Sequence, residues 1–146
     1  MKIGIGSDHA GYVMKSAVIK HLEEKELEFI DYGTFKEESV NYPDYALKVS
    51  KAVADGEVDY GILICGTGIG MSITANKVKG IRAALVHDVE TSRMSRLHNN
   101  ANIMCLGGRI LEEKLALEMV DVWLNTSFEG GRHENRLKLI STLTGL

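Results

Sequence analysis

A cysteine beside a glycine-rich turn is the first feature of this 146-residue sequence that could perform chemistry. Cys65 directly precedes Gly66-Thr67-Gly68-Ile69-Gly70. Glycines allow positive φ and close approach of the backbone to a ligand, and successive N–H groups at the start of a helix favour an anion. A thiolate at that position would be a base or a nucleophile near neutral pH. The alternative interpretation is a tight turn that follows a buried, inert cysteine.

Two histidines stand beside polar residues that suit a sugar or a proton transfer. His9 follows Asp8, and a carboxylate next to an imidazole can fix its tautomer or favour its protonated form. His98 opens the segment His98-Asn99-Asn100-Ala101-Asn102, where an imidazole beside an amide could bind sugar hydroxyls. The alternative for this segment is a helix end followed by a loop.

Three arginines could bind a phosphate group. Arg132 and Arg136 are four residues apart, which places both guanidinium groups on one face of a helix. Two guanidinium groups held together suit a dianionic phosphate. Arg109 follows Gly107-Gly108, directly after a predicted strand. The alternative is that all three are solvated surface residues.

Other sites are disfavoured by spacing. The five histidines and two cysteines show neither H-x-x-x-H nor C-x-x-C spacing, so we expect no metal site. The glycines near residues 4–11 and 66–70 depart from the dinucleotide-binding pattern, and the sequence has neither a phosphate-binding Gly-Lys-Ser/Thr motif nor a Gly-x-Ser-x-Gly motif. We therefore expect no cofactor.

Composition limits the class of protein further. The net charge of −3 disfavours non-specific binding to nucleic acid, and no apolar stretch approaches the ~18 residues of a membrane span. The N-terminal residues do not form a secretory signal, and the cysteines cannot build a disulfide framework, so we expect a cytoplasmic protein. No linker or repeat divides the chain, which predicts a single domain over residues 1–146.

Strands and helices alternate about five times along the chain. Short apolar runs predict strands at Lys2–Ser7, Glu28–Tyr32, Tyr60–Cys65, Ile81–Val86 and Asn102–Leu106. The helices predicted between and after them include Glu90–His98 and Glu134–Leu143, and the helix after Gly70 is expected to reach about Val78. Such alternation predicts an α/β/α sandwich around a five-stranded parallel sheet. Ligands bind such sheets at the carboxyl ends of the strands, where these loops gather polar and glycine residues.

Four sequence blocks together resemble ribose-5-phosphate isomerase B. They are SDHAG at 7–11, NYPD at 41–44, CGTGIGMSITANK at 65–77, and HNNAN with LGGR across 98–109. The resemblance spans nearly the whole chain and places Cys65 in the cysteine-base branch of the superfamily. It implies a Rossmann-like, metal-free enzyme that interconverts ribose 5-phosphate and ribulose 5-phosphate. It also implies a homodimer with shared active sites, which sometimes pairs into a tetramer.

The resemblance also implies a role for each matching residue. Cys65 matches the general base, His98 the acid/base that opens the sugar ring, and Thr67 a member of the anion-binding segment. The residues that match substrate contacts are Asp8, His9, Gly66, Thr67, Gly68, Ile69, Gly70, Asn99, Arg109, Arg132 and Arg136. In the family, His98, Asn99 and the arginines would come from the partner chain.

Three other functions remain open at this stage. An isomerase of the same superfamily could act on a six-carbon sugar phosphate or a rare sugar. A non-catalytic module could bind a sugar phosphate or a nucleotide, although this leaves Cys65 and His98 without a role. A thiol redox domain would need a second reactive cysteine near Cys65, and Cys105 is the only other cysteine.

Overall fold

The computed structural model describes residues 1–146 and contains a five-stranded parallel sheet in the order β2-β1-β3-β5-β4. The strands are β1 (Lys2–Ser7), β2 (Glu28–Asp31), β3 (Tyr60–Cys65), β4 (Ala83–Leu85) and β5 (Ile103–Gly107). The helices are α1 (Tyr12–Glu24), α2 (Tyr42–Ala54), α3 (Ile69–Ala75), α4 (Val89–Leu97), α5 (Glu113–Asn125) and α6 (Arg132–Thr144). The α/β/α sandwich expected from the sequence is confirmed.

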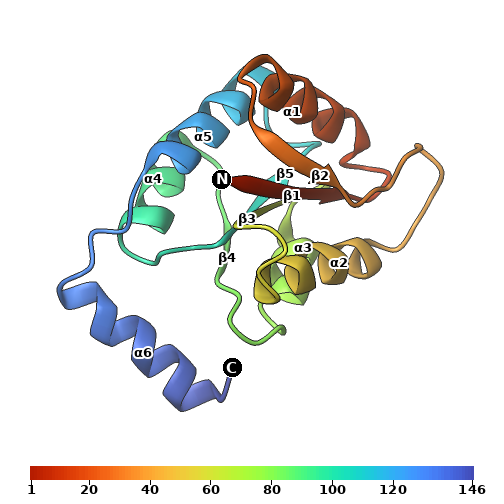
Figure 1. Ribbon diagram of the computed structural model, residues 1–146. Helices are drawn as coiled ribbons and strands as arrows, with labels where there is room; N and C mark the ends of the chain where they lie inside the picture. The colour runs from red at the N-terminus through yellow and green to blue at the C-terminus, as the bar shows by residue number, and fades with distance from the viewer.

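Helices cover both faces of the sheet (Figure 1). Side chains alternate between the faces of a strand, so Ile62 and Ile64 of β3 pack with α1 and α5, whereas Leu63 and Cys65 pack with α2 and α3. All four side chains are buried, which explains the continuous apolar run of this strand. This alternation determines the face of the sheet on which each side chain lies, and the side chain of Cys65 lies on the face of α2 and α3.

The last helix lies apart from the sheet (Figure 1). Leu139, Ile140 and Leu143 of α6 are exposed, although a helix that packs against its own domain normally buries such side chains. A groove of about 390 Å³ separates α6 from the region of β4, and Ile81, Ala83, Leu137 and Ile140 are among the residues that line it. This helix therefore presents apolar surface that its own chain does not cover.

Three of the predicted elements have an end that differs from the observed one by two residues or more, whereas the other differences are of one residue. β4 was expected at Ile81–Val86 and covers Ala83–Leu85, because it is an edge strand whose only strand neighbour is β5. Asn76 caps α3 and ends it short of Val78, and its side chain bonds both the N–H and the carbonyl of Ala83. α6 begins at Arg132 rather than Glu134, directly after two glycines with positive φ.

No helix combines the length with the apolar character that crossing a bilayer requires.

Candidate active site

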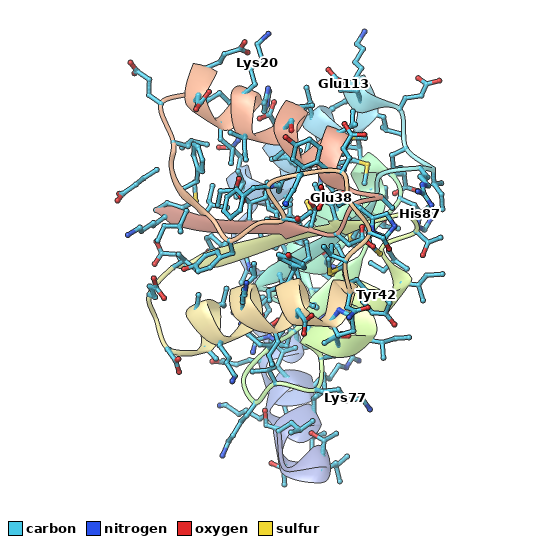
Figure 2. The ribbon with its side chains drawn as sticks, turned by 90° about the vertical axis from the view of Figure 1, so that its right-hand side faces the viewer. Lys20, Glu38, Tyr42, Lys77, His87 and Glu113 are labelled. Carbon is cyan, nitrogen blue, oxygen red and sulfur yellow. The ribbon has the colours of Figure 1, made fainter.

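Backbone hydrogen bonds join the loops that follow β1, β3 and β5. The N–H of Asp8 donates to the carbonyl of Ile64 at 3.2 Å. The N–H groups of Gly108 and Arg109 donate to the carbonyls of Cys65 and Gly66 at 2.8 Å and 3.0 Å. These bonds fix three loops at the carboxyl edge of the sheet, where a ligand of this fold class is expected. Figure 2 shows Tyr42 and His87 at the same side of the molecule.

Cys65 lies at the centre of this edge, with 5% of the residue exposed. Its Sγ accepts a hydrogen bond of 3.1 Å from the N–H of Gly68. The sulfur therefore faces the glycine turn, and this donor stabilises a thiolate. A base with this geometry can remove a proton from a carbon atom held against the turn.

The glycine turn leaves several N–H groups available to a ligand. The N–H groups of Gly66, Thr67 and Gly70 donate to no acceptor within the chain. The Oγ1 of Thr67 accepts the N–H of Ile69 at 3.2 Å, which leaves its own hydroxyl hydrogen free. Main-chain N–H groups fixed beside a base are suited to stabilise negative charge on a substrate oxygen.

Close packing explains two of the turn's glycines. Gly68 has a φ of +78°, and a Cβ there would lie 2.6 Å from the side chain of Leu85 and 2.9 Å from the backbone of Leu106. A Cβ on Gly70 would lie 2.5 Å from the ring of Tyr42. Tyr42 thus forms a wall beside the turn, a position that the sequence did not predict for it.

His9 and Asp8 are at this edge but do not act on one another. The Nδ1 of His9 accepts the N–H of Val40 at 3.2 Å, so the proton of the neutral ring is on Nε2. The Asp8 carboxylate, largely buried, instead accepts the N–H of Gly11 at 3.0 Å. The structure does not show the interaction between Asp8 and His9 that their adjacency made possible, because the Asp8 carboxylate caps the following turn.

Arg109 lies beside the glycine turn of its own chain. The resemblance had implied that all three arginines reach the site from the partner. Its Nη1 lies 3.9 Å from the place that a Cβ on Gly66 would occupy in the same chain. The guanidinium forms no ion pair within the chain. Since β3 and β5 are neighbours, the loop after β5 carries Arg109 directly to the turn after β3.

His98 and Asn99 are at the opposite end of the sheet. His98 ends α4, which leads back toward the start of β5. Ile103 pairs with Gly61, and Gly107 pairs with Cys65. Four residue steps of about 3.3 Å therefore separate the two ends by about 13 Å along the strands. One chain does not bring His98 to Cys65.

Arg132 and Arg136 both lie on α6, so their spacing of four places them on one face, although the helix predicted from Glu134 left Arg132 outside. Neither forms an ion pair with a carboxylate of the chain. Both lie close enough to His133 for their positive charges to lower the pKa of its imidazole. Two neighbouring unpaired guanidinium groups are suited to an anion, but α6 lies apart from the carboxyl edge (Figure 1).

A cluster of His98, Glu129 and His133 was not predicted. Their donor atoms lie within 4.8 Å of one another, close enough to share a metal ion. However, the Nε of Arg132 donates to the Nε2 of His133 at 3.4 Å, which occupies one lone pair and adds a positive charge. The two imidazoles are also stacked, whereas ligands of one ion converge on it. The cluster is better suited to holding a proton than a metal.

Cys105 does not supply the second reactive thiol that a redox function would need. It is completely buried, and burial raises the pKa of its thiol, with a further contribution from Cys65. A neutral, inaccessible thiol is a poor nucleophile. The surroundings of the two cysteines therefore favour acid–base chemistry at Cys65 over disulfide exchange.

Comparison with known proteins identifies the family. The model of the family described as Ribose/Galactose Isomerase matches residues 3–140. The chain belongs to this family. Ribose-5-phosphate isomerase B of Escherichia coli is 46% identical over 142 residues, which are 97% of this chain and 95% of that protein. A putative sugar phosphate isomerase of Bacillus subtilis is 50% identical with the same coverage.

Solved structures of the ribose/galactose isomerase family are similar over their full length. Ribose-5-phosphate isomerase B of Clostridium thermocellum is 53% identical with a TM-score of 0.98, covering 99% of this chain and 98% of that chain. The Mycoplasma genitalium enzyme with bound ribulose-5-phosphate is 40% identical with a TM-score of 0.93, covering 99% and 96%. The similarity therefore includes α6 and the loops at the carboxyl edge.

Proposed function

We propose that this protein is a ribose-5-phosphate isomerase, which interconverts D-ribose 5-phosphate and D-ribulose 5-phosphate without a cofactor. The observation that supports it most is the Sγ of Cys65, which accepts the N–H of Gly68 at 3.1 Å beside free N–H groups of the turn. Its similarity to enzymes of that name gives the substrate class. Residues 1–146 act as one domain in this proposal.

The proton transfer takes place at Cys65. The thiolate removes the proton from carbon 2 of the open aldose and returns it to carbon 1, while the hydroxyl proton moves from oxygen 2 to oxygen 1. Negative charge develops on oxygen in the cis-enediolate between these steps. Within the turn Gly66–Gly70, the N–H groups of Gly66, Thr67 and Gly70 have no acceptor in the chain and stabilise that charge. One such donor typically contributes about 10²- to 10³-fold to kcat.

The other site residues bind and prepare the sugar. His98 opens the ring by moving a proton between the ring oxygen and the anomeric hydroxyl, as an imidazole can near neutral pH. Asp8, Asn99 and the hydroxyl of Thr67 bind sugar oxygens. His9, Arg109, Arg132 and Arg136 hold the phosphate end. Binding energy from this remote group orients the reacting carbons.

The proposed enzyme is a homodimer in which two chains build each site. The length of about 13 Å between the two ends of β5 supports this arrangement, because Cys65 lies at one end of the sheet and His98 precedes the other, so one chain cannot supply both to one sugar. The exposed apolar side chains of α6 and the groove beside it offer surface for a second copy. Arg132, Arg136, His98 and Asn99 then come from the partner, and Arg109 from the chain that supplies Cys65. Two dimers pairing into a tetramer is a further step of the proposal.

We also propose a cytoplasmic location. Both cysteines are free, and Cys65 must stay reduced to act as a base.

The decisive experiment is a panel of five- and six-carbon aldose phosphates and free aldoses, assayed for ketose formation in the presence of a chelator. We expect turnover of ribose 5-phosphate well above that of six-carbon phosphates or free sugars. Preferred turnover of a six-carbon phosphate would assign the protein to another branch of the family. Binding of ribose 5-phosphate without turnover would leave a sugar-phosphate binding module as the function.

A further inference from the structure

His98 is stacked on a second imidazole and lies beside a carboxylate. The rings of His98 and His133 are 4.2 Å apart at their centres and 17° from parallel. One carboxylate oxygen of Glu129 lies 3.6 Å from the Nε2 of each ring. The three residues come from the end of α4, the loop before α6 and the first turn of α6. We call them the imidazole cluster.

The contacts of His133 determine where a proton resides in the imidazole cluster. The N–H at Nε of Arg132 donates to the Nε2 of His133 at 3.4 Å, so this nitrogen carries a lone pair and the ring is neutral. Burial lowers the pKa of His133 most, followed by the charges of His98, Arg132 and Arg136, and Glu129 opposes them. The Glu129 carboxylate therefore lies between the neutral ring of His133 and the ring of His98.

A buried arginine holds the segments that carry the imidazole cluster. Arg96 donates from Nη1 to the carbonyl of Ala101 at 2.6 Å and from Nε to the carbonyl of Thr126 at 3.3 Å. The N–H of Glu129 also donates to the carbonyl of Leu97 at 3.0 Å. The loop after α4 and the loop before α6 are therefore joined on both sides of His98.

We propose that Glu129 and His133 are positioning residues for His98: Glu129 places a negative charge 3.6 Å from the Nε2 of His98, and the neutral His133 ring fixes the plane of its imidazole. This inference rests on the proposed role of His98 in opening the sugar ring. It adds two residues that touch no reacting atom. An exposed carboxylate and a buried neutral ring together would keep an acid ready in the orientation that the sugar needs.

The charge effect is tested by NMR on the unliganded protein with ¹⁵N-labelled histidine. We expect Glu129→Gln to lower the ratio of protonated to neutral His98 at about pH 6.5 by roughly 1.4- to 5-fold, the range that exposed ion pairs give. Glu134→Gln is the matched control, because Glu134 pairs with neither imidazole. An unchanged ratio in Glu129→Gln would overturn the proposal. This result is independent of whether ribose 5-phosphate is the substrate.

The orienting effect is tested by steady-state kinetics with ribose 5-phosphate. We expect His133→Ala to lower kcat by about 2- to 12-fold, the worth of one aromatic contact, with KM changed less than about twofold. His133→Phe keeps a flat ring and should restore most of kcat. A rise in KM without a fall in kcat, or a Phe variant as slow as the Ala variant, would refute the orienting role. If no variant and no wild-type protein shows turnover, the proposed function fails and the NMR ratio still decides the effect of Glu129.

Discussion

The two cysteines show how residue type alone leaves a role undecided. Both cysteines lie in apolar strands, and both side chains pack on the face of the sheet that α2 and α3 cover. Cys65 is at the end of its strand, where a main-chain N–H reaches its sulfur. Cys105 is two residues short of the end of β5 and fully buried. Two residue positions along neighbouring strands therefore separate a candidate base from a core side chain.

We predict that Cys65→Ala lowers kcat for ribose 5-phosphate by about 10²- to 10⁴-fold, the contribution of a general base. Binding of the sugar phosphate should remain, because the phosphate contacts are elsewhere. Cys105→Ala is the control and should keep kcat within about threefold while lowering the melting temperature. Kinetics and calorimetric binding measure the two effects. Normal turnover by Cys65→Ala would exclude thiolate catalysis.

Gly68 and Gly80 have similar backbone angles but different surroundings. Gly68 and Gly80 have φ of +78° and +82°, but a Cβ on Gly80 would meet no atom within 4 Å. Gly80→Ala should cost about 1–2 kcal/mol of the free energy of unfolding from backbone conformation alone. Gly68→Ala adds a clash with Leu85 and Leu106, so we expect a larger loss and a kcat reduced at least tenfold. Equal effects on stability and activity would contradict the packing argument.

At the scale of elements, the sequence predicted every strand and helix but not all of their ends. The run Tyr60–Cys65 was predicted with its observed bounds, because a strand buried on both faces leaves a continuous apolar pattern. The predicted β4 was too long, because the apolar run continues on both sides of Ala83–Leu85 although the residues there do not pair in the sheet. Local hydrophobicity predicts an element, whereas its limits depend on contacts from elsewhere in the chain.

The candidate site was predictable to the same degree. The contact between Cys65 and the turn after it could be predicted because these residues are adjacent in the sequence, and the sulfur accepts an N–H of that turn. Glu129 and His133 stand four residues apart, but glycines 130 and 131 interrupt any helix between them, so the spacing alone gave no reason to pair them. Their meeting with His98 depends on how α6 leaves α5, which no local pattern records.

Arg96 joins the loop after α4 to the loop before α6. The residue is 5% exposed, its guanidinium also donates to Asn100 and Tyr60, and no carboxylate neutralises it. Lysine cannot make these bonds together, so Arg96→Lys should destabilise the protein by about 2–3 kcal/mol and reduce kcat by loosening the His98 loop. Arg93→Lys, on an exposed position of the same helix, is the control. Denaturant unfolding and kinetics measure both; an Arg96→Lys variant as stable as the control would contradict this role.

The imidazole cluster predicts a dependence of stability on pH. Burial lowers the pKa of His133 below its ordinary value of 6.5, so the unfolded chain binds this proton more readily than the folded one. The stabilisation from neutral His133 is complete above pH 6.5 and is lost as pH falls through the folded pKa. Wild-type stability should therefore decline more between about pH 7 and pH 5 than that of His133→Phe. Denaturant unfolding at each pH measures this; parallel curves would show that His133 does not contribute.

Asp88 does not interfere with that measurement. Its carboxylate accepts the N–H and hydroxyl of Thr91 at the start of α4, and these bonds lower the pKa of Asp88 below its ordinary value of 3.8. The stability it contributes is present above pH 3.8 and is lost only as pH falls through the folded pKa. The two groups thus act in separate ranges of pH.

At the scale of the whole molecule, the parallel sheet separates the site into two parts. All carboxyl ends lie at one edge, so Cys65, His9 and Arg109 gather there, while every helix that follows a strand returns its end to the other edge. His98 ends such a helix. In the proposed homodimer, a second chain joins the two parts on one substrate, with the end of its α4 at the first chain's carboxyl edge.

This arrangement predicts complementation between two inactive variants. Cys65→Ala lacks the base and His98→Ala lacks the ring-opening group, so each homodimer should be inactive on ribose 5-phosphate. After subunit exchange, one of the two sites in a mixed dimer receives both wild-type residues. At equal concentrations half of the dimers are mixed, which predicts recovery of about one quarter of the wild-type activity. Native mass spectrometry of chains of different mass confirms exchange, and a Cys65→Ala, His98→Ala double variant mixed with either single variant is the control. Mixed dimers without recovered activity would show that each site is built within one chain, and would require α4 or α6 to adopt another position in the working enzyme.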